Sequence, residues 1–178
     1  MSKWFYPLKE ATMLPDELGQ FGAVRKNHTH EGIDLYGESK DPVFAAEDGV
    51  VVGIEWFTGE KAPTPSPWWN NTQGILVEGD SGVIVYGEIL ISEGIEIGSK
   101  VERGQKIGEL ETVLLKDKGR PMTMLHLELY EKGIRKTGEW DHGLPKPEGL
   151  LDPTSFIEEA FFENYKGDPE KAYYKKED

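Results

Sequence analysis

Two apolar runs on either side of a short, glycine-bounded turn constrain the fold of this chain most strongly. Residues 75–78 (Ile-Leu-Val-Glu) and 83–86 (Val-Ile-Val-Tyr) favour strands, and Gly79-Asp-Ser-Gly82 lies between them. Two strand-forming runs joined by so short a turn are typical of a β-hairpin. The middle of the chain is therefore predicted to form antiparallel sheet.

The flanking sequence extends this pattern. Residues 50–56 form a β-branched run, and residues 124–130 alternate, with leucines at every second position and His126 and Glu128 between them. Alternation with a period of two places these two polar side chains on one face of a strand. We expect a mainly β protein with an antiparallel, sandwich or barrel-like sheet. Two proline-rich stretches, 58–73 and 135–150, are predicted to be long loops.

The end of the domain is predicted to be helical. Phe156, Ile157, Ala160 and Phe161 are spaced as one apolar face of a helix, and Ser155 with Glu158 matches a capping box. We expect three parts: an N-terminal extension (1–20), a single domain (21–157), and the rest of the helix with a charged tail (158–178). The length of 178 residues is enough for a hydrophobic core of its own.

Composition excludes several classes of site and partner. The formal net charge of -13 argues against nucleic acid and against an anionic membrane surface, because both require basic residues. The chain has no cysteine, so a metal site must use histidine and carboxylate ligands. The first residues have no apolar core of a signal peptide, and no stretch is long enough to span a membrane. We expect a soluble protein that is cytoplasmic, or phage-encoded and released by lysis.

Two separated segments carry the ligands that a metal centre needs. His30-Glu-Gly-Ile-Asp34 offers an imidazole and a carboxylate, and Met124-Leu-His126-Leu-Glu128 offers a second imidazole. Two histidines and one carboxylate form the ligand set of zinc sites that keep a fourth position open. Each segment alone is a weak signal, since isolated histidines are common on protein surfaces.

The order of motifs along the chain resembles the lysostaphin-type zinc metallopeptidases, which cut the peptide cross-links of peptidoglycan. The matching motifs are Phe21-Gly22 with Arg25, residues 30–35, residues 42–52, residues 74–90, residues 98–108, residues 125–129 and Leu151-Asp-Pro153. The resemblance implies that His30, Asp34 and His126 bind zinc and that the partner is a cell-wall peptide or a related peptide.

The chain departs from this family at two catalytic positions. Met124 stands where the family's His-x-His motif has its first histidine, and Glu88 replaces the cleft histidine of a Tyr-x-His-Leu motif. Methionine cannot transfer a proton, whereas Glu88 can act as a general base. In a second register, His126 takes the catalytic position and Glu128 becomes the ligand. We prefer the first register, because the family has a glutamate two residues after the ligand.

Other residues are candidates for roles around the cleft. His28 and His142 are each either an ordinary exposed histidine or a substitute for a missing one. Trp68, Trp69, Trp140 and His142 lie in the two long loops and are candidate substrate contacts.

Two functions follow. The first is a zinc-binding peptidase-like domain with weakened or lost catalysis and a binding or structural role. The second is an active zinc endopeptidase with Glu88 as base. A biotinyl- or lipoyl-like carrier is a third reading of residues 101–110, but the turn at 79–82 has no lysine for attachment.

Overall fold

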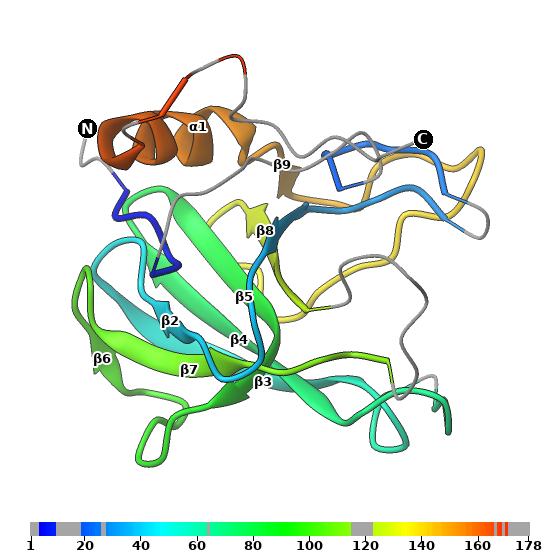
Figure 1. Cartoon of the computed structure of the whole chain (residues 1–178). Helices are drawn as coiled ribbons and strands as arrows, with labels where there is room; N and C mark the ends of the chain where they lie inside the picture. The colour runs from blue at the N-terminus through cyan, green and yellow to red at the C-terminus, as the bar shows by residue number, and fades with distance from the viewer. Residues whose placement is uncertain are drawn as a thin grey trace.

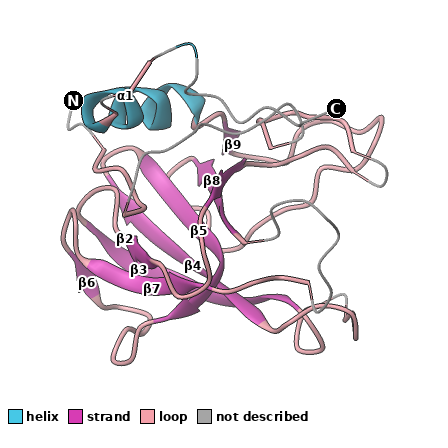
Figure 2. Ribbon diagram, viewed as in Figure 1, coloured by secondary structure: helices cyan, strands magenta, loops and turns pink. Residues whose placement is uncertain are grey.

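The computed structural model describes residues 4–9, 19–25, 28–63, 65–114, 123–165, 167–168 and 170. It confirms the mainly β prediction with a C-terminal helix (Figure 1, Figure 2). Within the described residues there are nine strands and one helix: β1 (Ile33–Tyr36), β2 (Pro42–Phe44), β3 (Gly49–Thr58), β4 (Thr72–Gly79), β5 (Gly82–Ile91), β6 (Lys100–Val101), β7 (Lys106–Leu110), β8 (Met124–Tyr130), β9 (Leu150–Leu151) and α1 (Thr154–Asn164).

The strands pair antiparallel in one sheet whose main path is β1-β8-β5-β4-β3-β6. Strand β7 pairs with β2 and β5, and β9 pairs with β8. The predicted hairpin is β4 and β5, with Gly79 opposite Gly82 at the turn. The loops at 59–71 and 135–149 also agree with the predicted irregular stretches.

Strand β8 lies between β1 and β5, and this explains its alternating sequence. Leu125, Leu127 and Leu129 are at most 1% exposed and belong to the main hydrophobic core. His126 and Glu128 point to the opposite face and are also buried, because other side chains cover that face. The polar face of β8 is therefore an interior site rather than a solvent-facing surface.

The N-terminal segment contributes to the core. Trp4, Tyr6 and Leu8 are each at most 6% exposed. Trp4 stacks on Phe156 of α1 with ring centroids 4.6 Å apart, and Tyr6 meets Phe161 edge-on at 5.7 Å. Figure 1 shows this segment beside α1, which lies across one end of the sheet.

The predicted capping box at the start of α1 is wrong. Pro153 is the N-cap residue, and no side chain caps the helix. The carboxylate of Asp152 accepts hydrogen bonds from the backbone N–H and the hydroxyl of Thr154 instead. The apolar face agrees with the pattern, since Ile157, Ala160 and Phe161 are buried. No helix in the described part of the chain is long and apolar enough to cross a membrane.

Candidate functional site: a three-ligand metal centre

Three side chains from two strands and one loop converge in the interior. Asp34 and His126 are directly opposite each other on β1 and β8, and His30 lies in the loop before β1. His30 Nε2 is 3.1 Å from Asp34 Oδ1 and 3.2 Å from His126 Nδ1, and the last two atoms are 3.0 Å apart. All three residues are buried, and together they form a group that could hold a metal ion.

Neighbouring acceptors set the orientation of both imidazole rings. His30 Nδ1 lies 2.9 Å from the backbone carbonyl oxygen of Gln20, and His126 Nε2 lies 2.8 Å from Glu128 Oε2. A carbonyl or carboxylate oxygen can only accept, so each of these outer nitrogens carries a hydrogen. In the neutral tautomers, the two inner nitrogens and Asp34 Oδ1 then direct lone pairs at one another.

A cation between these three atoms would remove the repulsion between their lone pairs, and the nitrogen and oxygen donors suit zinc. Zinc bonds to nitrogen and oxygen of about 2.0–2.1 Å in a tetrahedron place neighbouring ligand atoms about 3.3 Å apart. The three measured separations of 3.0–3.2 Å are close to that spacing. Outer hydrogen-bond partners of the kind seen here are also usual for zinc-binding histidines.

The pKa shifts within the cluster also favour a positive charge among the three side chains. Burial by itself raises the pKa of Asp34, but the charge of His30 and the hydrogen bonds to both imidazoles hold it far below its usual range. Burial by itself lowers the pKa of His126, yet its hydrogen bonds to Asp34 and Glu128 raise it well above 6.5. Without a metal, a proton on the imidazole takes the place of the cation.

Two further groups hold the ligands from outside. Arg25 Nη2 donates to Asp34 Oδ2 at 2.7 Å, which leaves Asp34 Oδ1 directed at the cluster. The hydroxyl of Tyr130 donates to Glu128 Oε1 at 2.5 Å and accepts from the backbone N–H of Gly138. The loop at 135–149 is therefore tied to the same network.

Glu88 lies beside this cluster because of an irregularity in β5. The pairing of β4 with β5 shifts between Gln73 and Ile75, so that two residues of β5, Gly87 and Glu88, face one of β4. Glu88 has a φ of 63°, in the left-handed region that non-glycine residues rarely adopt. A bulge of this kind redirects a side chain, and such strain is frequent at functional sites.

The side chain of Glu88 is partly buried, and one of its carboxylate oxygens is fully shielded from solvent. Its Oε2 atom makes no hydrogen bond with the described residues. Burial, and after it the negative charge of Asp34, raise the pKa of Glu88 to about 7. Glu88 is outside the group of three converging ligands. It is placed as a neighbour of the metal centre that can exchange a proton near neutral pH.

The other candidate residues differ in where they lie relative to the three converging side chains. Met124 precedes His126 by two residues on β8 and so shares its face. Glu128, the ligand in the second register, lies outside the converging group and bonds to the outer nitrogen of His126. His28 Nδ1 lies 3.0 Å from the carbonyl oxygen of Thr29, and His142 is exposed in the loop at 135–149.

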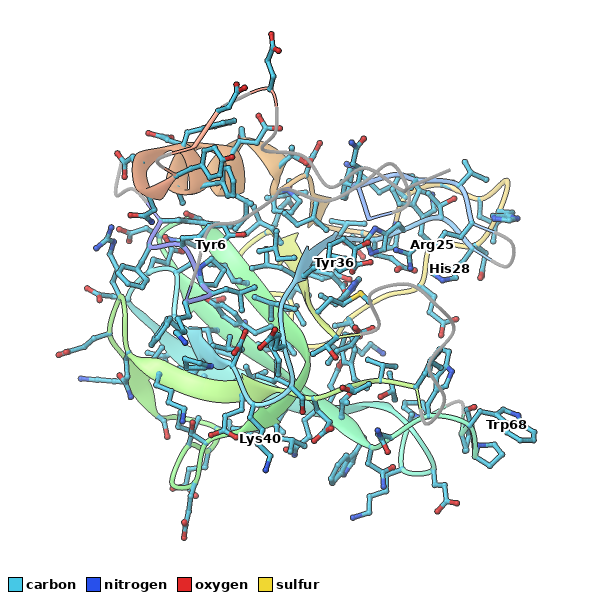
Figure 3. The ribbon with its side chains drawn as sticks, viewed as in Figure 1. Tyr6, Arg25, His28, Tyr36, Lys40 and Trp68 are labelled. Carbon is cyan, nitrogen blue, oxygen red and sulfur yellow. The ribbon has the colours of Figure 1, made fainter. Side chains whose placement is uncertain are left out.

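Among the described residues, Trp140 is the loop tryptophan that contacts the segment carrying the ligands. The backbone of Trp140 accepts from Thr29 N–H and donates to Glu31 Oε1, and its ring lies 5.6 Å from that of Phe21. Trp68 and Trp69 are 73% and 43% exposed in the other loop. Figure 3 shows Trp68 projecting from that loop, away from Arg25 and His28.

Nothing in the sequence pattern points to the Gln20 carbonyl or to Phe57 as parts of the site. The Phe57 ring lies 5.7 Å from that of His126, and a Cβ atom at Gly87 would come within 2.7 Å of it. These contacts join segments far apart in sequence. The contact of Glu128 with His126 could be predicted from the sequence, since alternation on β8 places both side chains on the same face.

Comparisons with known proteins identify solved structures with a similar fold. CbpA from L. salivarius REN has a similar structure, with a TM-score of 0.56, 21% identity, and coverage of 90% of this chain and 98% of that chain. Lysostaphin from Staphylococcus simulans has a TM-score of 0.52 and 18% identity, over 83% of this chain and 51% of that chain. At these identities the likeness establishes the fold alone.

A search of curated protein sequences found no significant match. The family model described as Peptidase family M23 matches residues 28–137, which is more than half of the chain and includes all three converging side chains. This chain belongs to Peptidase family M23.

Proposed function

We propose that this chain is a zinc-dependent endopeptidase that acts on cell-wall peptides, with Glu88 as its general base. Peptidase family M23 is zinc-dependent and cleaves peptidoglycan peptides. The observation that carries the proposal is the buried Oε2 atom of Glu88, which has no hydrogen-bond partner among the described residues, beside three converging ligands. A base with a pKa near the working pH is efficient in proton transfer, and the pKa of Glu88 is raised to about 7.

His30, Asp34 and His126 are the residues that would hold the metal. Zinc, when bound, supplies a Lewis acid that polarises the scissile carbonyl and acidifies water. Glu128 keeps the ring of His126 in the tautomer that exposes Nδ1 to the cluster. Arg25 fixes the other oxygen of Asp34, so that the carboxylate cannot rotate away from the cluster.

Glu88 accounts for the proton transfers of amide hydrolysis. As water adds to the carbonyl carbon and the new C–O bond forms, the Glu88 carboxylate accepts the proton that the water loses. When the C–N bond breaks, Glu88 returns this proton to the leaving nitrogen. The products are a carboxylic acid and an amine, and Glu88 ends in its original state.

A zinc-binding domain without turnover is the second candidate, and Met124 is the observation that favours it. Methionine on the face of β8 next to His126 removes a proton donor that the family's His-x-His motif provides. Losing one donor to the developing oxyanion typically costs about 10²–10³ in rate. Such a domain would retain cell-wall peptide without cutting it.

A digest of purified peptidoglycan decides between the two candidates. Zinc-loaded wild type is expected to release free amines, and Glu88→Gln is expected to release them about 10²–10⁴ times more slowly at equal zinc content. Wild type that co-sediments with peptidoglycan but releases no amine would support the binding domain instead. Gain of activity only in the double variant Glu88→His with Met124→His would support it further.

A further inference from the structure

The register of β1 and β8 places a phenol next to the position that lacks a histidine. Asp34 is opposite His126, and Tyr36 is opposite Met124. Residues two apart on a strand point to the same face, so all four side chains lie on the face of the metal cluster. The alternate residues of β1, Ile33 and Leu35, are buried in the core on the other face.

Tyr36 is therefore the residue of β1 directly opposite Met124. In an antiparallel pair, side chains directly opposite each other have Cβ atoms about 4.5–5.5 Å apart. Tyr36 is half-buried, and in Figure 3 it lies on the side of β1 toward Arg25, which bonds to Asp34. Asp34 and Tyr36 are separated along β1 by a rise of about 7 Å, a spacing similar to the reach of a whole tyrosine side chain.

We propose that Tyr36 is a catalytic residue whose hydroxyl donates a hydrogen bond to the oxyanion that develops on the scissile carbonyl. Met124 cannot donate, and the proton that Glu88 takes from water is the one that it returns to the leaving nitrogen. The hydroxyl of a neutral tyrosine is a hydrogen-bond donor. The inference rests on the proposed peptidase function, and it deepens that function by dividing the two missing roles: Glu88 transfers the proton and Tyr36 stabilises the charge.

Tyr36→Phe tests this directly, because it keeps the ring and removes only the hydroxyl. In the peptidoglycan digest, the variant is expected to lose about 10²–10³ in kcat with unchanged zinc content. Tyr165→Phe is the matched control: its hydroxyl bonds to the carbonyl oxygen of Asp168 beyond α1, and its removal is expected to leave kcat unchanged.

A second measurement does not depend on activity. Inorganic phosphate is a tetrahedral oxyanion, and its affinity for the zinc-loaded protein can be measured by calorimetry. Removing a hydrogen bond to a charged group is expected to weaken phosphate binding about 10- to 100-fold in Tyr36→Phe and not in Tyr165→Phe.

The two measurements separate the failure of this inference from the failure of the proposed function. Equal phosphate affinity in wild type and Tyr36→Phe overturns the role of Tyr36, whatever the digest shows. A loss of kcat that accompanies a lower melting temperature and unchanged phosphate affinity also overturns it, because the effect is then structural. If wild type releases no amine, the peptidase function fails, while weaker phosphate binding in Tyr36→Phe still supports the oxyanion contact.

Discussion

Replacing Glu88 with glutamine is expected to stabilise the metal-free protein while removing its activity. The Oε2 atom of Glu88 is buried and has no hydrogen-bond partner among the described residues, and desolvation by burial raises the pKa of this residue to about 7 from an ordinary 4.5. Between these two pH values the folded state binds more protons than the unfolded state does. The free energy of unfolding therefore falls as pH rises through this window, and the full cost is present above pH 7.

The structure sets the size of the effect. The difference between 4.5 and about 7, at about 1.36 kcal/mol for each pH unit, gives at most roughly 3 kcal/mol of destabilisation by the charged carboxylate at pH 8. Glutamine carries no charge and escapes this cost. For a chain of this size, that corresponds to a melting temperature up to about 6–12 °C higher for Glu88→Gln.

Thermal unfolding of chelator-treated proteins at pH 5 and pH 8 checks this prediction. Glu88→Gln should differ little from wild type at pH 5 and should be clearly more stable at pH 8. Glu93→Gln, in the exposed turn after β5, is the control and should show no such gap. The zinc-loaded Glu88→Gln should lose about 10²–10⁴ in kcat. A stability gap that is absent at pH 8, or equal at both pH values, would refute the view of Glu88 as a buried, unpaired carboxylate.

Three further predictions concern the metal and the fold. Zinc at 100 times its Kd should raise the free energy of unfolding by about 2.7 kcal/mol and the melting temperature by about 5–11 °C, and calorimetric scans should show that His126→Ala abolishes this rise. Glu128→Ala should weaken zinc binding about 10- to 100-fold in a competition titration with a chromophoric chelator, and unchanged affinity would exclude its orienting role. Trp4→Ala, which removes a 2% exposed ring stacked on Phe156, should cost about 3–5 kcal/mol in urea unfolding, whereas Phe162→Ala on the 40% exposed side of α1 should cost well under half of that.

The elements that local pattern can specify are predictable from this sequence. Period-two alternation in 124–130 and the glycine-bounded turn at 79–82 identify β8 and the β4–β5 hairpin, because side-chain direction in a strand depends only on position. Trp4, Tyr6 and Leu8 also alternate, and this is a signal for a core strand-like segment before residue 20. The helix cap was less predictable. Ser155 and Glu158 match a capping box, but the N-cap residue is Pro153 and no side chain caps the helix.

The reactive groups of this protein can be identified in its amino-acid sequence: two imidazoles and an aspartate without any thiol, a glutamate and a methionine where the family has histidines, and strands to carry them. How these groups act on one another depends on the tertiary structure. The 3.0–3.2 Å separations within the cluster depend on the register of β1 against β8, and the burial of Glu88 depends on a bulge in β5. Distances and desolvation arise between segments that are up to 96 residues apart, so no local pattern encodes them.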